Sequence, residues 1–183
     1  MKTQLIIDNA PRPASNGGTF ERHHPVSGEL ITTGAAGTVE DAIAAADSAA
    51  AAFEGWSTTG PSARRAVLLK AADILESKLA EFCKVMAAEV GASELWATFN
   101  VMGSAALFRE AAGLATQIQG ETIPTDKPGT ISMTIRQAAG VVLSIVPWNG
   151  PILLGARAIA YPLVCGNPVV FKASESSPRT HEL

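Results

Sequence analysis

The sequence predicts an α/β protein built around a parallel β-sheet. Residues 141–175 read as a strand, a helix and a second strand, with polar groups after each strand. The 183-residue chain is 47% hydrophobic and 17% charged, which is typical of a folded domain. Helical patterns fill most of residues 39–117. Because parallel sheets bind ligands at the carboxyl ends of their strands, we expect the functional site within residues 141–175.

Composition argues against several classes of function. The formal net charge is −3 and the basic residues are scattered, so nucleic acid is not an expected partner. No stretch reaches the roughly 18 uninterrupted apolar residues of a membrane span, and no signal sequence is evident. His23 and His24 read as a turn, and Cys83 and Cys165 lack metal-like spacing. We expect reduced thiols, with Cys165 packed, no metal, and a cytoplasmic location.

The first elements are short strands followed by helices. Leu5–Ile7, Gly17–Arg22 and the segment after Ser27 and Gly28 predict three edge strands. Four helices are predicted over residues 39–53, 62–78, 79–90 and 93–117, with a capping box at Thr38 and Asp41, a start at Pro61 and a break at Gly91. The second helix is expected to bury one face, formed by Val67, Leu68, Ala71, Ala72 and Leu75.

Residues 120–138 alternate in polarity and predict a β-hairpin with its turn at residues 127–129. Ile131, Met133 and Ile135 would share one side of it. Such an arm can pair with another subunit or with an internal sheet edge, and both readings stay open.

The last part of the chain predicts a strand–helix–strand unit. Residues 140–146 are continuously apolar, as in a parallel strand covered on both faces. Pro147 ends this strand, and a helix that is apolar almost all round, and therefore buried, begins near Pro151. The second strand is expected at Pro168–Phe171, after a right-handed crossover.

Two motifs resemble the NAD-binding half of the aldehyde dehydrogenase family: VPWNGP at 146–151 and CGNPVVFKASE at 165–175. The resemblance covers the whole chain and implies a Rossmann-type parallel sheet with N-terminal helices and a β oligomerisation arm. It divides the chain into strands and helices of the NAD-binding domain (1–117), the arm (118–139) and the first βαβ part of the cofactor-binding core (140–183). The remaining core and the catalytic domain would lie outside this chain.

The resemblance also implies a reaction. A cysteine outside this chain would attack the aldehyde to give a thiohemiacetal, hydride would pass to NAD, and a thioester would be hydrolysed with a glutamate as general base. Asn149 would donate its side-chain amide to the oxyanion. Asn149 could also cap the helix at Pro151, and the two roles are not exclusive. Since neither Cys83 nor Cys165 matches the nucleophile, the 183-residue chain alone is expected to be inactive.

Cofactor contacts are implied at both strand ends. Lys172 and Glu175 resemble the residues that bind the adenosine ribose hydroxyls. A carboxylate there repels a 2′-phosphate, which favours NAD over NADP, although Glu175 could instead be a solvated loop acid. Further contacts are expected from Ile145, Val146, Pro147, Trp148 and Ser174.

Three residues concern the substrate. Gly150 and Arg157 stand where many family members carry aromatic residues, and Trp96 falls in a region that lines the family's substrate tunnel. The glycine would leave room for a ring, and Arg157 could bind a phenolic oxygen, which suggests a hydroxybenzaldehyde such as salicylaldehyde. Because an isolated buried charge is costly, Arg157 should face the pocket or a polar partner, which could be an acid outside this chain. Trp96 could equally be a core residue.

This combination most resembles the family members that oxidise salicylaldehyde during bacterial breakdown of aromatic compounds, with those that oxidise benzaldehyde or vanillin next. A homodimer or homotetramer is implied. A different class of function is a truncated homologue that binds nucleotide or another subunit without catalysis. An unrelated doubly wound dehydrogenase would carry GxGxxG after its first strand, where this chain has PWNGP.

Overall fold

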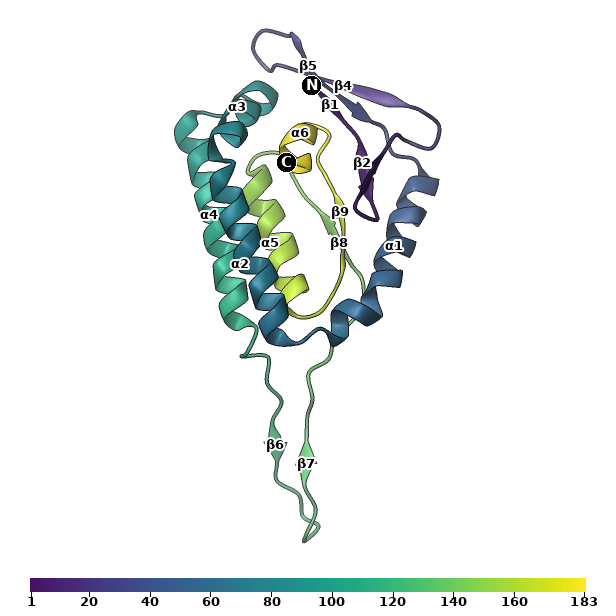
Figure 1. Ribbon diagram of the computed structural model, residues 1–183, viewed down its shortest axis with the longest axis vertical. Coiled ribbons are helices and arrows are strands. Elements are labelled where there is room, and N and C mark those ends of the chain that lie inside the picture. The colour runs from purple at the N-terminus through teal and green to yellow at the C-terminus, as the bar shows by residue number, and fades with distance from the viewer.

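A computed structural model describes residues 1–183 and shows an α/β fold with a long projecting hairpin (Figure 1). The helices are α1 (Val39–Thr58), α2 (Pro61–Ser77), α3 (Leu79–Val90), α4 (Glu94–Leu114), α5 (Pro151–Val164) and α6 (Pro178–Glu182). The strands are β1 (Lys2–Thr3), β2 (Leu5–Ile7), β3 (Ala10–Arg12), β4 (Thr19–His23), β5 (Leu30–Ala35), β6 (Thr122–Ile123), β7 (Ser132–Met133), β8 (Val142–Ile145) and β9 (Val169–Lys172).

Helices α2, α4 and α5 lie side by side and bury the main apolar cluster (Figure 1). Small residues such as Ala105, Ala112 and Ala160 are almost fully buried there, which lets the helix axes approach closely. A second cluster joins α3 and α4 to Ile152 in the first turn of α5. The second cluster therefore holds the start of α5, and the first cluster holds its middle and end. The predicted site lies directly before this start.

The strand–helix–strand unit is confirmed. Strands β8 and β9 are parallel neighbours, with Ile145 opposite Lys172. The Ser144 hydroxyl donates to the carbonyl of Ala158 on α5 at 2.8 Å, so α5 covers this face of the strand. The expectation of burial on both faces is wrong for this chain, because Leu143 and Ile145 are 63% and 69% exposed. Alternate residues of a strand point to opposite faces, and only the Ser144 face has helix α5 on it.

The N-terminal strands form two small sheets. The three predicted strands are present as β2, β4 and β5, and β1 and β3 are additional. The predicted edge position is wrong for β5, because β1 and β4 pair with it on both sides. Strand β5 lies between β1 and β4, while β2 and β3 form a hairpin. Asp8 and Asn9 take positive φ angles of 55° in that hairpin turn, a conformation that Asp and Asn tolerate better than most residues.

The first residues of the helices were predicted more accurately than the last residues. Thr38 and Asp41 form the predicted capping box, and Gly91 ends α3 in the left-handed conformation with φ of 67°. Helix α1 extends five residues beyond the predicted end, whereas α4 stops three residues short. Two packing predictions are wrong: Val67 is 51% exposed at the edge of the buried face of α2, and Cys165 is exposed where α5 ends.

The predicted hairpin is an extended arm that points away from the body (Figure 1). Strands β6 and β7 pair with each other alone, so the arm adds no strand to a sheet of the body. Ile131, Met133 and Ile135 are 75%, 62% and 73% exposed. The arm thus carries an uncovered row of apolar side chains.

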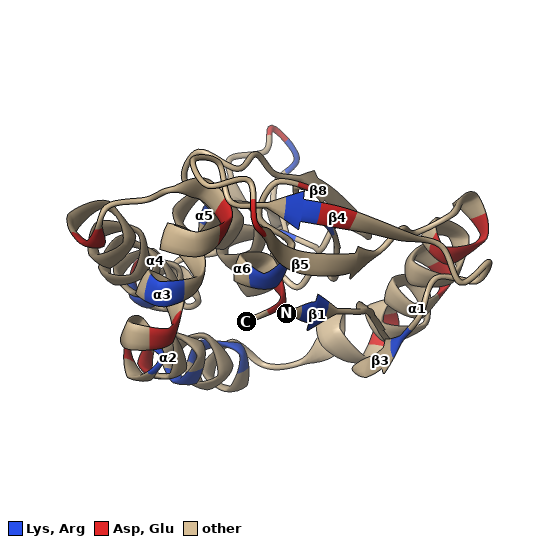
Figure 2. Ribbon diagram, turned by 90° about the horizontal axis from the view of Figure 1, so that it is seen from above, with Lys and Arg blue, Asp and Glu red and all other residues tan.

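Charged residues of both signs are interspersed over the helices and strands in Figure 2. No helix is long and apolar enough to span a membrane. His23 and His24 lie at the β4–β5 turn, where the His23 ring contacts the carbonyl of Gly28. No group of three or more metal-ligating side chains is gathered anywhere in the chain.

Candidate functional site

The predicted site residues meet at one edge of the β8–β9 pair. Residues 146–149 follow β8, and residues 173–175 follow β9. The backbone N–H of Val146 donates to the carbonyl of Lys172 at 3.2 Å, which continues the parallel ladder to the ends of both strands. Both segments are therefore at the carboxyl edge, where α/β sheets bind ligands.

Asn149 is exposed in the turn between β8 and α5. Its backbone carbonyl accepts a hydrogen bond from the indole N–H of Trp96 at 3.0 Å, while its side-chain amide makes no hydrogen bond within the chain. Gly150, rather than Asn149, occupies the N-cap position of α5, and the Asn149 side chain accepts no hydrogen bond from the first turn of that helix. The capping alternative for Asn149 is therefore wrong, and its amide is free to donate to a ligand.

Trp96 lies on the surface of α4, next to the turn that carries Asn149. Its side chain is 43% exposed and stacks on Phe99, with ring centroids 5.4 Å apart and planes at 19°. Within these 183 residues Trp96 therefore lies at the surface rather than in the core. Trp96 and Phe99 present aromatic surface beside Asn149, as a site for a flat, apolar ligand requires.

Buried Asn100 supports this corner and was missed by the sequence reasoning. Its side-chain amide donates to the carbonyl of Trp96 at 3.0 Å, and its oxygen accepts from the N–H of Leu153 in the first turn of α5 at 3.4 Å. Asn100 is fully buried, so these bonds satisfy a group that would otherwise destabilise the core. An amide side chain on the apolar face of α4, one turn before the buried Ser104, was the available signal.

Gly150 is buried between α4 and α5. Its φ of −139° is open to any residue. A Cβ atom built there would lie 3.5 Å from the Asn100 side-chain oxygen and 3.7 Å from Leu154, which are ordinary contacts. Neither backbone nor packing within this chain therefore requires glycine.

Arg157 lies nearly two turns further along α5 and is exposed. It forms no ion pair within the chain, and its exposure keeps the guanidinium from being an isolated buried charge. Burial raises the pKa of Tyr161, one turn later, with Glu110 on α4 raising it further and Arg157 lowering it. Arg157 thus lies close to α4 with its guanidinium unpaired.

The other strand end carries a charged pair. The Lys172 ammonium is 3.5 Å from the Glu175 carboxylate, and these side chains are 56% and 71% exposed. The pKa of Glu175 is lowered, first by its own backbone N–H and then by the charge of Lys172. Ser174 between them is buried, and its hydroxyl accepts from the N–H of Ser176 at 3.2 Å. Lys172 and Glu175 are thus open to a ligand, whereas Ser174 shapes the loop.

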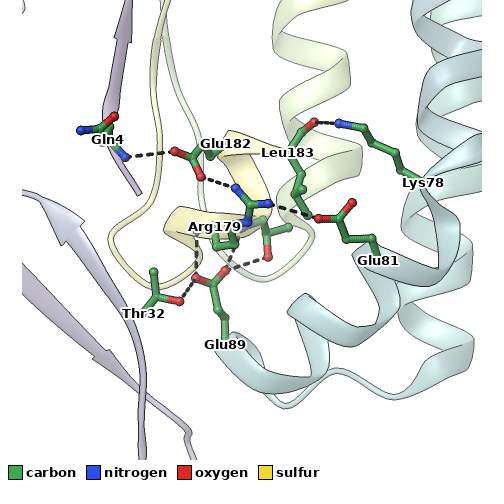
Figure 3. A network of polar contacts seen from close by, with 9 residues as sticks. Gln4, Thr32, Lys78, Glu81, Glu89, Arg179, Glu182 and Leu183 are labelled. Atoms are coloured by element: carbon green, nitrogen blue, oxygen red, sulfur yellow. Dashed lines mark hydrogen bonds and ion pairs between the residues drawn. The ribbon is translucent and has the colours of Figure 1, made fainter. Parts of the chain in front are cut away.

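Glu89 of α3 was also missed, and it holds the segment that follows this loop (Figure 3). It is fully buried, and its carboxylate accepts four hydrogen bonds, each 2.8–2.9 Å long. The donors are the Thr32 hydroxyl, the N–H of Arg179, and the N–H and hydroxyl of Thr180. Its place on the buried face of α3 was the signal that sequence reasoning could have used. The bonds fix α6 against α3 and β5.

The two strand ends fit one part of a dinucleotide site. Ile145 and Trp148 expose apolar side chains at the sheet edge, being 69% and 53% exposed, while Val146 is buried. The exposed Lys172–Glu175 pair offers a donor and an acceptor to sugar hydroxyls. These residues suit a ligand with an apolar ring system and a polar sugar.

Comparison with known proteins agrees with this geometry. Residues 12–183 match the aldehyde dehydrogenase family. The chain is 64% identical to salicylaldehyde dehydrogenase from Pseudomonas putida over 183 residues and 51% identical to vanillin dehydrogenase from Pseudomonas fluorescens over 179 residues. These alignments cover 100% and 98% of this chain but 38% and 37% of the relatives.

A crystal structure of salicylaldehyde dehydrogenase from Pseudomonas putida G7, complexed with salicylaldehyde, superposes with a TM-score of 0.98 at 64% identity. It is matched over 100% of this chain and 38% of its own length. The chain therefore spans well under half of the proteins that it resembles. With the match over residues 12–183, the strand–helix–strand unit and the agreement in fold, this chain belongs to the aldehyde dehydrogenase family.

Proposed function

We propose that the protein carrying this chain oxidises an aromatic aldehyde of the salicylaldehyde type to its carboxylic acid, with NAD as cofactor. The hydrogen bond from Trp96 to the Asn149 carbonyl carries this proposal, because it places aromatic surface beside the proposed oxyanion donor. The names of the two relatives, both dehydrogenases of aromatic aldehydes, support the substrate class.

In this proposal the chain supplies half of an active site. The Asn149 amide donates to the carbonyl oxygen of the aldehyde as negative charge develops there. Neither Cys83 nor Cys165 matches the family's nucleophile, so the resemblance implies that a cysteine outside this chain forms the thiohemiacetal and thioester. NAD supplies the hydride acceptor when it is bound. The isolated 183-residue chain is accordingly proposed to be inactive.

The proposed division of the chain follows these roles. Residues 1–117 form the strands and helices of the NAD-binding domain, and residues 140–183 the first βαβ part of the cofactor-binding core. Residues 118–139 form an oligomerisation arm in a homodimer or homotetramer. The exposed Ile131, Met133 and Ile135 support this role, since an apolar row on an unpaired hairpin is suited to burial against another subunit.

The complete protein that carries this chain is expected to reduce NAD in the presence of salicylaldehyde, with kcat/KM at least about tenfold higher than for a short aliphatic aldehyde. The reason is the aromatic surface of Trp96 and Phe99 beside Asn149. NADH absorbance measures the rate, with vanillin and benzaldehyde as further substrates. Nucleotide binding without turnover of any aldehyde would favour the non-catalytic homologue instead.

Arg157→Ala is expected to lower kcat/KM for salicylaldehyde about tenfold or more, and for benzaldehyde less than threefold. A guanidinium that binds the phenolic oxygen makes a charge-assisted hydrogen bond, which benzaldehyde lacks. Steady-state kinetics with both aldehydes give the ratio. Arg65→Ala, which removes an exposed arginine from α2, is the matched control. Equal losses for the two substrates would exclude a specific role for Arg157 at the hydroxyl.

Glu175→Ala is expected to shift the ratio of kcat/KM for NAD to that for NADP about tenfold toward NADP. Members of this family use NAD or NADP, and a carboxylate beside the ribose repels the 2′-phosphate of NADP. Glu54→Gln on the exposed side of α1 is the control for a simple loss of charge. If the ratio stays unchanged, Glu175 is a solvated loop acid.

A further inference from the structure

His181 of α6 lies between the two segments that carry the site. Its Nδ1 atom is 3.2 Å from the backbone nitrogen of Ser174, and its Nε2 atom is 3.2 Å from the carbonyl oxygen of Pro151. The ring also contacts Phe171 edge-on, with centroids 5.3 Å apart. The imidazole therefore joins the loop after β9 to the first residue of α5.

These two contacts define the state of the ring. The Ser174 N–H is a donor, so Nδ1 must accept and carry no proton. Nε2 then carries the proton and donates to the Pro151 carbonyl. Burial lowers the pKa of His181, the hydrogen bond to the Pro151 carbonyl raises it, and the positive charge of Lys172 lowers it; together they bring it to about 4, so the ring is neutral near pH 7.

The two joined segments carry different ends of the proposed site. Ser174 lies between Lys172 and Glu175, the proposed ribose contacts, and Pro151 lies two residues after Asn149. The backbone ladder between β8 and β9 ends at the bond from Val146 to Lys172. Beyond that point the imidazole is the bridge between the Ser174 loop and the start of α5.

We propose that His181 is a positioning residue that fixes the 172–175 loop against the first turn of α5, and so sets the ribose contacts relative to Asn149. This inference rests on the proposed function, because it assigns the loop to the cofactor. The position of His181 is itself fixed, because buried Glu89 accepts hydrogen bonds from the backbone N–H groups of Arg179 and Thr180, the two residues directly before it. The 172–175 loop thus depends on α6 for its place.

The test uses His181→Leu and His181→Gln in the complete protein that carries this chain. Leucine removes the hydrogen bonds to Ser174 and Pro151, and also the 3.4 Å contact of Nδ1 with the Ser177 hydroxyl, whereas the glutamine amide keeps one acceptor and one donor. His181→Leu is expected to raise KM for NAD about tenfold while KM for the aldehyde changes less than twofold. His181→Gln is expected to recover KM for NAD to within about threefold of the wild type. Phe171→Leu, which removes the aromatic contact but keeps the imidazole and its hydrogen bonds, is the matched control.

Amide hydrogen exchange gives a readout that needs no turnover. His181→Leu is expected to speed exchange at Ser174 and its neighbours at least tenfold, and His181→Gln much less. Unchanged exchange in this loop would overturn the proposal. The proposal would also be overturned if His181→Leu lowered thermal stability but left KM for NAD unchanged, because His181 would then contribute only to packing. Failure of the wild type to use any aldehyde contradicts the proposed function instead, and leaves the exchange result to decide whether the imidazole fixes the loop.

Discussion

Asn149→Ala is expected to lower kcat for an aromatic aldehyde about 10²- to 10³-fold in the complete protein, with little change in KM. An oxyanion donor acts mainly on the transition state, and the loss of one such donor has about this effect in other enzymes. The side-chain amide of Asn149 makes no hydrogen bond within the chain, so its removal leaves no partner unsatisfied. Steady-state kinetics at saturating NAD provide the measurement.

Two further variants separate catalysis from folding at this corner. Trp96→Phe keeps an aromatic ring but removes the indole N–H that binds the Asn149 carbonyl, so its effect on kcat should be well below that of Asn149→Ala. Asn149→Asp loses the donor and adds a negative charge beside the oxyanion, so its loss should be at least as large. A loss below about tenfold in Asn149→Ala would exclude the oxyanion role.

Glu89→Leu is expected to destabilise the fold by about 3 to 5 kcal/mol, the largest stability effect that we expect in this chain. The substitution leaves the buried N–H groups of Arg179 and Thr180, and the Thr32 hydroxyl, without their acceptor. The midpoint of unfolding in urea measures the change, provided that the m value stays constant.

Glu81 supplies the matched control, because it lies on the same helix and pairs with the Arg179 guanidinium at the surface. Glu81→Leu should cost less than about 1 kcal/mol, since water and salt screen an exposed ion pair. Glu89→Gln should fall between the two, because the amide keeps one acceptor oxygen but turns an N–H₂ group toward a backbone donor. A Glu89→Leu variant as stable as Glu81→Leu would show that the four bonds contribute little.

Local signals were enough to predict the parts of the fold that depend on neighbours in sequence. The capping box at Thr38 and the break at Gly91 involve residues a few positions apart, so the chain itself specifies them. The polar residues after β8 and β9 were placed correctly at one edge, because consecutive parallel strands joined by a helix bring their carboxyl ends together.

Burial was predicted less well, because it depends on what lies opposite each side chain. Val67 shares the apolar character of Leu68, yet it lies outside the face that α4 and α5 cover. Leu143 and Ile145 read as buried strand residues, but α5 lies on the opposite face of β8. Arg157 was expected to face a pocket or a polar partner, and within this chain it is exposed and unpaired, so its partner stays a prediction.

The sequence by itself determined the order of the elements, the family of the protein and the residues proposed to act on substrate and cofactor. Those residues stand in short motifs whose spacing is local. Only the tertiary structure decided how they are held: Trp96 binds Asn149 from 53 residues away, and His181 and Glu89 join segments that are distant in the chain. Such contacts leave no periodic pattern in the sequence. Each one needs a side chain and a backbone group to come within hydrogen-bond distance, and only the packing of the helices and strands brings them together.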